Sequence, residues 1–143
     1  MASTFKSNLV KSNRRAGVGV GSQEIVIFAT YSVTAALVVN DVIQMVPVPA
    51  GATITGVTLG ATDLDTGGSA AIVLDVGDGG GTDRFIDGAT VGQAGGSTAT
   101  LAVAGFGYTY AAADTIDVLV QVAPTTGATS GTISLRVAYV LSR

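Results

Sequence analysis

The chain has 143 residues, enough for one domain with its own core, and it contains neither Cys nor His. Those absences exclude disulfides, a thiolate nucleophile and Cys-based metal sites, and they remove the commonest general base and transition-metal ligand. Charged residues are only 12% of the chain, against about 25% in an ordinary domain, so we expect other subunits to cover part of the surface.

Residues 1–23 are polar, basic and interrupted by glycine, and they predict a flexible N-terminal arm. The arm holds four cations and no acid, a total of +4, whereas residues 24–143 hold ten acids and three arginines, a total of −7; the sum is the net charge of −3. Apolar side chains stand beside the cations, as in a segment that packs on a partner. The candidate anchoring residues are Phe5, Lys6, Leu9, Lys11, Arg14 and Arg15.

Two other interpretations of the arm remain open. A short helix over residues 4–12 would place Phe5 and Leu9 on one face, because they are four positions apart. Nucleic acid is a weak candidate partner, since four charges without interleaved aromatics make a poor footprint. No apolar run approaches the roughly 18 residues that span a membrane, so no membrane partner is expected.

Residues 24–143 predict an all-β domain. Strands are expected at residues 24–31, 41–48, 53–61, 70–76, 83–86, 98–104, 108–110, 116–122 and 133–141. The last two runs alternate most clearly, with apolar side chains at every second position, which is typical of half-buried antiparallel strands. Glycine-rich turns separate the runs and no helical period follows residue 24. The pattern therefore predicts a two-sheet antiparallel β-sandwich of jelly-roll type.

The segment at residues 76–85, VGDGGGTDRF, is the most distinctive loop. Asp78 to Phe85 match a calcium β-roll repeat except at the first position, but that motif works through many stacked copies and this chain has one. A phosphate loop would need Lys followed by Ser or Thr after the glycines, and neither is present. We therefore expect a strand-to-strand corner with no metal and no cofactor. Its glycines would allow positive φ, and Asp78 and Asp83 would accept backbone N–H bonds, each worth about 0.5–2 kcal/mol.

Asp63-Leu64-Asp65 is the other acidic cluster. In an extended segment its two carboxylates would point the same way, and such pairs can perform glycosidase chemistry. Adjacent acids at a strand end also serve as plain turn formers, and no aromatic platform for a sugar accompanies them because Trp is absent. We prefer the structural interpretation and expect no catalytic residues.

Several of these segments, taken together, resemble a known family. Their order and spacing are similar to those of small structural proteins of tailed-bacteriophage virions, of the head-decoration or cement type. The segments that carry the resemblance are residues 43–45 (IQM), 48–52 (VPAGA), 63–65 (DLD), 74–79 (LDVGDG) and 85–88 (FIDG), and it extends loosely over residues 108–141. The resemblance implies a β-sandwich that oligomerises, often as a trimer, on the capsid exterior after synthesis in the host bacterial cytoplasm.

Composition, strand pattern and resemblance together favour a non-enzymatic decoration protein that stabilises the head by bridging capsomers. Its expected partners are further copies of itself and the major capsid protein or neighbouring virion subunits. A tail, head-fibre or baseplate component is the nearest alternative. A carbohydrate-binding surface module belongs to another class and is disfavoured by the shortage of aromatics; an enzyme would depend on Asp63 and Asp65 alone.

Overall fold

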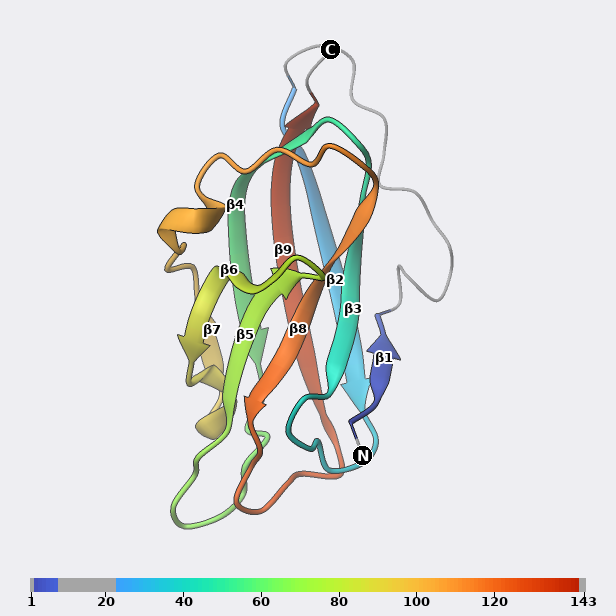
Figure 1. Ribbon diagram of the computed structural model, residues 1–143. Coiled ribbons are helices and arrows are strands. Elements are labelled where there is room, and N and C mark those ends of the chain that lie inside the picture. The colour runs from blue at the N-terminus through green and yellow to red at the C-terminus, as the bar shows by residue number, and fades with distance from the viewer. Residues whose placement is uncertain (1, 8–22, 142–143) are drawn as a thin grey trace.

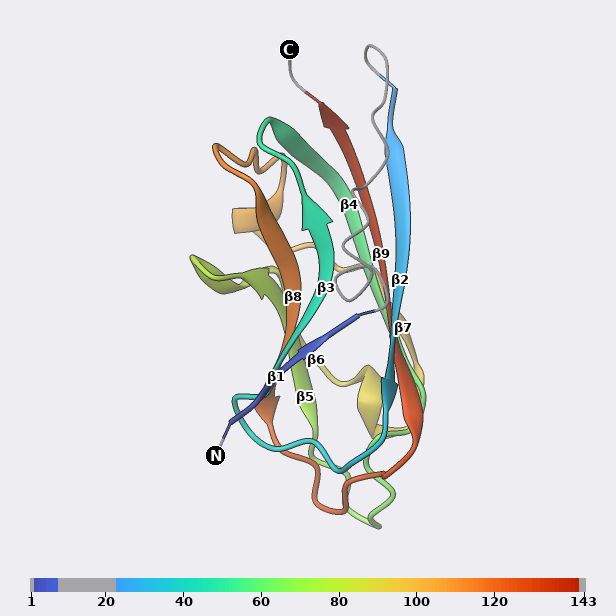
Figure 2. The same cartoon turned by 90° about the vertical axis from the view of Figure 1, so that its right-hand side faces the viewer.

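The computed structural model describes residues 2–7 and 23–141, and it confirms the predicted two-sheet β-sandwich. One sheet has the strand order β1-β3-β8-β5-β6 and the other the order β2-β9-β4-β7, and the two lie face to face (Figures 1 and 2). The strands are β1 (Thr4–Lys6), β2 (Ile25–Val33), β3 (Val42–Val48), β4 (Ala52–Ala61), β5 (Val73–Asp78), β6 (Gly81–Ala89), β7 (Gly96–Thr98), β8 (Asp114–Val122) and β9 (Gly131–Leu141).

The antiparallel strand pairs are nested along the chain. β5 pairs with β6, β4 with β7, β3 with β8 and β2 with β9, so each pair encloses the one before it. Pairing of β4 with β9 and of β5 with β8 then joins the pairs into two sheets. The outermost pair brings together strands at opposite ends of the domain, so the sandwich forms only when distant segments meet.

The core lies between the sheets and follows the alternation seen in the sequence. Ile116, Val118 and Val120 of β8 are fully buried, and Ile133, Leu135, Val137 and Tyr139 of β9 face them from the other sheet. Val122 continues the same pattern but is 40% exposed at the end of β8. Burying such side chains contributes about 1.5–3 kcal/mol each, which makes this contact the main source of stability.

One predicted strand, at residues 98–104, is wrong for most of its length. β7 ends at Thr98, and the chain then forms a loop that includes a single 3₁₀ turn, η2 (Val103–Gly105). The Ala102 N–H donates to the Phe85 carbonyl, and the Gly105 N–H donates back to Ala102, so the backbone turns on itself instead of extending the sheet. Residues 108–110 contribute one isolated bridge, between Thr109 and Thr53. A second 3₁₀ turn, η1 (Val91–Gln93), precedes β7.

The start of the predicted arm is part of a sheet. β1 pairs with β3 in parallel, and the buried Ser7 follows it, with its hydroxyl donating to the Met45 carbonyl. The helical alternative therefore does not hold at Thr4–Lys6; residues 8–22 lie outside the described part of the chain. Within the described residues, no helix is long and apolar enough to cross a membrane.

Candidate functional site

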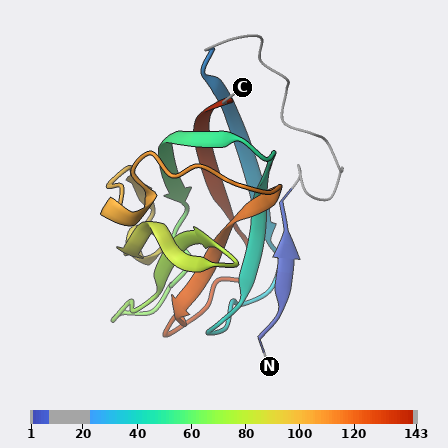
Figure 3. The same ribbon diagram turned by 45° about the horizontal axis from the view of Figure 1, so that its top comes forward.

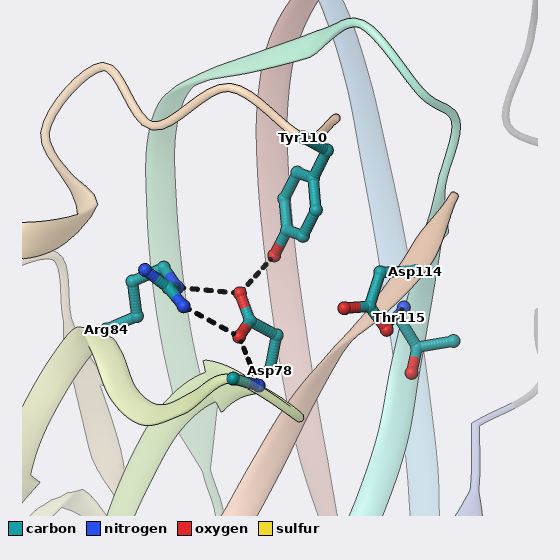
Figure 4. Close-up of polar contacts among 6 residues, drawn as sticks. Asp78, Arg84, Tyr110, Asp114 and Thr115 are labelled. Carbon is teal, nitrogen blue, oxygen red and sulfur yellow. Dashed lines mark hydrogen bonds and ion pairs between the residues drawn. The ribbon is translucent and has the colours of Figure 1, made fainter. Parts of the chain in front are cut away.

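The β5–β6 hairpin carries a cluster of charged and aromatic side chains around Asp78 (Figure 4). Arg84 approaches the Asp78 carboxylate with both Nε and Nη2, at 2.7 and 3.2 Å. The Tyr110 hydroxyl donates to the same carboxylate at 2.9 Å, and so does the Gly80 N–H. The Arg84 guanidinium also lies 4.0 Å from the centre of the Tyr108 ring, a cation–π contact. One buried carboxylate thereby joins the hairpin to the β7–β8 loop.

Burial and charge act against each other on this carboxylate. Removal from water acts to raise the pKa of Asp78, but hydrogen bonds from Arg84, Tyr110 and Gly80 outweigh it and hold the pKa below its usual range. Burial, with Asp78 as acceptor, raises the pKa of Tyr110. The cluster therefore holds an ion pair and a neutral phenol, an arrangement that fixes two segments together.

Two expectations for this loop are wrong. Within residues 76–85 no glycine has positive φ; Gly77 is required for space, because a Cβ there would lie 2.0 Å from the Gly81 carbonyl oxygen. Asp83 is exposed on β6 and accepts no hydrogen bond within the described part of the chain, because its side chain faces solvent. The expected backbone bond of Asp78 to Gly80 is present.

The hairpin also covers Asp117, a second carboxylate with a different environment. A hollow of about 80 Å³ lies between them, lined by Val42, Gly77, Asp78, Gly79, Thr82, Asp117 and Leu119. The Oδ1 atom of Asp117 is buried and has no hydrogen-bond partner. Burial, together with the charges of Asp114 and Asp78, raises the pKa of Asp117 to about 7 although the Thr115 hydroxyl acts to lower it.

Asp63 and Asp65 do not form a pair of parallel carboxylates. Asp63 is exposed, and its Oδ1 accepts the Asp65 N–H at 3.0 Å. Asp65 is buried, and its carboxylate accepts four backbone N–H groups, from Ala71, Ile72, Thr125 and Thr126. Burial acts to raise the pKa of Asp65, but these bonds lower it well below the usual range. The geometry supports the structural interpretation, since Asp65 holds two loops together.

The structure describes only two of the six candidate anchoring residues of the arm. The Phe5 ring packs against Tyr31 at 5.5 Å between centroids, and Lys6 is exposed beside Gln44 of β3. Asp41 supports this segment by accepting the Ser3 N–H at 2.7 Å. Leu9, Lys11, Arg14 and Arg15 lie outside the described residues, so the arm as a whole stays a prediction.

Sequence reasoning missed the exposed apolar side chains. Val103 is 93% exposed, Phe106 82% and Phe28 69%, while Val26, Val38, Val39 and Val122 are each between 38% and 48% exposed. The sequence did contain an indication of these exposed apolar side chains at residues 101–107 (LAVAGFG), which form a run without a polar side chain inside a glycine-rich loop. Among the described residues no group of three or more acidic side chains could hold a metal ion. The described surface therefore exposes several large apolar side chains.

Chains in solved phage capsid structures are similar to this chain, among them the following three. A chain of the capsid of Ralstonia phage GP4 is 27% identical, with a TM-score of 0.88 over 98% of this chain and 99% of that one. A chain of the cyanophage Pam1 capsid asymmetric unit is 29% identical, with a TM-score of 0.75 over 88% and 90%. A chain of the acid-stable capsid of Helicobacter pylori bacteriophage KHP30 shares the fold at 18% identity and a TM-score of 0.55, over 83% and 94%. No protein-family model and no curated protein matches the sequence.

Proposed function

We propose that this protein is a non-enzymatic structural component of a phage virion. The observation that carries the proposal is the full-length similarity to a chain of the Ralstonia phage GP4 capsid, in which nearly all of both chains superpose. The nested strand pairs are those of a jelly roll, an architecture common among viral capsid domains, and they support the same class. The polar clusters support it too, because Asp78 and Asp65 each serve to join segments of the fold.

Within that class we propose a decoration protein on the capsid exterior, made in the host cytoplasm, that bridges neighbouring capsomers as a homo-oligomer, with a trimer favoured. Internal DNA pressure pulls capsomers apart, and each bridge opposes it by burying apolar area at about 25 cal/mol per Å². Many copies act in parallel on one shell. The exposed Val103, Phe106 and Phe28 supply apolar area of the kind that such contacts use.

The number of copies in each particle tests this function. Quantitative mass spectrometry of purified virions should find the protein in an amount comparable to the major capsid protein. A ratio of only a few copies per particle would instead identify a tail, fibre or baseplate component. Its absence from purified particles would exclude a virion role and return attention to a surface carbohydrate-binding module.

The N-terminal arm should contribute to attachment. Reversing the charges of Lys6, Lys11, Arg14 and Arg15 to Glu should weaken binding to particles lacking the protein, mainly at low salt, where screening is least. Charge reversal leaves Phe5 and Ser7 in place, so the strand pairing of β1 should persist. Co-sedimentation with such particles at two salt concentrations measures the effect. Equal binding of the variant and the unmodified chain at low salt would show that the arm's cations make no contact with the partner.

A further inference from the structure

Two large apolar side chains stand at the tip of the β7–β8 loop. Val103 and Phe106 are 93% and 82% exposed, and we call them the knob. The chain around them, residues 101–107, contains no polar side chain. An exposed apolar tip is a liability for a protein that stays alone in solution, and such patches mark interaction sites.

The backbone under the knob is firmly held. The Ala102 N–H donates to the Phe85 carbonyl of β6 at 2.8 Å, and the Ile54 N–H of β4 donates to the Tyr108 carbonyl at 2.9 Å. Gly105 packs so closely on β6 that a Cβ would lie 2.5 Å from the Arg84 carbonyl oxygen. The knob is therefore preorganised, which lowers the entropic cost of docking it into a partner.

A complementary surface exists on the same chain. Phe28, 69% exposed, lies beside Val26, 38% exposed, on the outer face of β2, and Phe28 is directly opposite Arg136 of β9 in the strand register. We call Val26, Phe28 and Arg136 the β2 patch. Among residues 2–7 and 23–141 no acidic group forms an ion pair with Arg136. The patch thus offers an apolar surface and an available cation.

Charge and position both fit a contact between knob and patch. Asp83 and Asp87 are exposed on β6, the strand against which the knob loop packs, and their charge is opposite to that of Arg136. β6 and β7 end their sheets on one side of the sandwich, and β1 and β2 end them on the other. Figures 1 and 3 both show the η2 loop on the side away from β1. A contact between opposite sides is head-to-tail, and repeated contacts of this kind form a closed ring when the rotation between neighbouring copies closes.

We propose that the knob of one protomer docks on the β2 patch of a second copy of this chain, forming a cyclic homo-oligomer. Phe106 and Val103 lie on Phe28 and Val26 at the centre of the contact, and Asp83 and Asp87 face Arg136 at its rim. The proposal rests on the proposed function only in taking the protein to be a homo-oligomer. Beyond that function, it specifies that the knob of one copy meets the β2 patch of the next, so the contact joins two different surfaces.

Disulfide trapping tests this arrangement directly, because the chain has no cysteine of its own. Two full-length single variants, Phe106→Cys and Phe28→Cys, are coexpressed and oxidised. They should form a disulfide between copies, since the contact would bring the two residues within bonding range. Phe106→Cys alone should form none. A chain that carries both Phe106→Cys and Phe28→Cys should give a ladder of crosslinked species that stops at the size of the closed ring. Coexpression of Phe106→Cys with Val39→Cys, another exposed apolar position, is the matched control and should not crosslink.

Light scattering on the unmodified chain separates the possible failures. An oligomer whose Phe106→Cys and Phe28→Cys variants do not crosslink would overturn the knob-and-patch contact and leave the homo-oligomer standing. Crosslinking of Phe106→Cys with itself would show a symmetric contact and overturn the head-to-tail arrangement. A 14.1 kDa monomer at micromolar concentration would overturn the homo-oligomer as well.

A charge swap provides an independent measurement. Arg136→Glu alone, or Asp83→Arg with Asp87→Arg, should raise the dissociation constant of the oligomer by roughly threefold to tenfold, as expected for rim charges. Combining all three changes should restore much of the affinity. Removing the aromatic anchor with Phe106→Ser should have a larger effect, roughly tenfold or more, because central aromatics dominate such contacts. If the combined variant is weaker than either parent, the two surfaces do not face each other.

Discussion

Replacing Asp78 with alanine is expected to lower the free energy of unfolding by about 3–5 kcal/mol, the cost of breaking a buried ion pair from one side. The change leaves the Arg84 guanidinium without its carboxylate and the buried Tyr110 hydroxyl without an acceptor. It also removes the bond that closes the hairpin at Gly80. This effect is larger than the 0.5–2 kcal/mol expected from a turn hydrogen bond alone, because three further contacts depend on the same group.

Asp83→Ala is the matched control, since it removes a carboxylate from the same hairpin. Asp83 is exposed and accepts no hydrogen bond in the described part of the chain, so the change should stay within about 0.5 kcal/mol. Urea unfolding of both variants at pH 7 measures the difference. If Asp78→Ala costs no more than Asp83→Ala, the cluster does not stabilise the fold. Because the pKa of Asp78 is lowered by folding, its contribution is complete above about pH 4 and is lost as the pH falls further.

Replacing Asp117 with asparagine is expected to raise the free energy of unfolding above pH 7, whereas replacing Asp78 with alanine lowers it. The raised pKa of about 7, against about 3.9 in an unfolded chain, means that the folded state binds more protons between these values. Stability from this group therefore falls as the pH rises from about 4 to 7, and the penalty is complete above 7. The shift corresponds to at most about 4 kcal/mol, and partial exposure of the side chain reduces the expected gain to about 1–3 kcal/mol.

Thermal unfolding at pH 4 and pH 8 measures this prediction. Asp117→Asn should raise the melting temperature by roughly 3–10 °C at pH 8 and change it little at pH 4. Asp83→Asn removes an exposed charge of the same sign and separates the local effect from the change in net charge. Equal melting temperatures for Asp117→Asn and the unmodified chain at pH 8 would show that the Asp117 carboxylate is satisfied, contrary to its orphaned Oδ1.

The local sequence was sufficient to predict most of the strands. β8 and β9 were predicted from side-chain alternation alone, because one face of each strand lies on the core and the period of a strand is two residues. The absence of Cys and His, and the low share of charged residues, likewise restricted the classes of protein before any contact was known. These properties depend on each residue and its immediate neighbours, so they can be read along the chain.

The partners of the polar groups were decided by the tertiary structure. Asp78 and Tyr110 are 32 positions apart, and the four N–H donors of Asp65 come from two segments, one of them 60 positions away. Gly80 and Arg84 bind Asp78 from within DGGGTDR, but the sequence pattern did not show that Asp78 is buried and Asp83 exposed, because the β7–β8 loop that covers Asp78 comes from a distant segment. The same holds within residues 101–107, where the position of each side chain over β6 decided that Leu101 packs on the core while Val103 and Phe106 face solvent. Burial and hydrogen bonding depend on segments that meet only when the nested strands close, so the sequence alone predicted the sandwich and the fold decided which surfaces it presents.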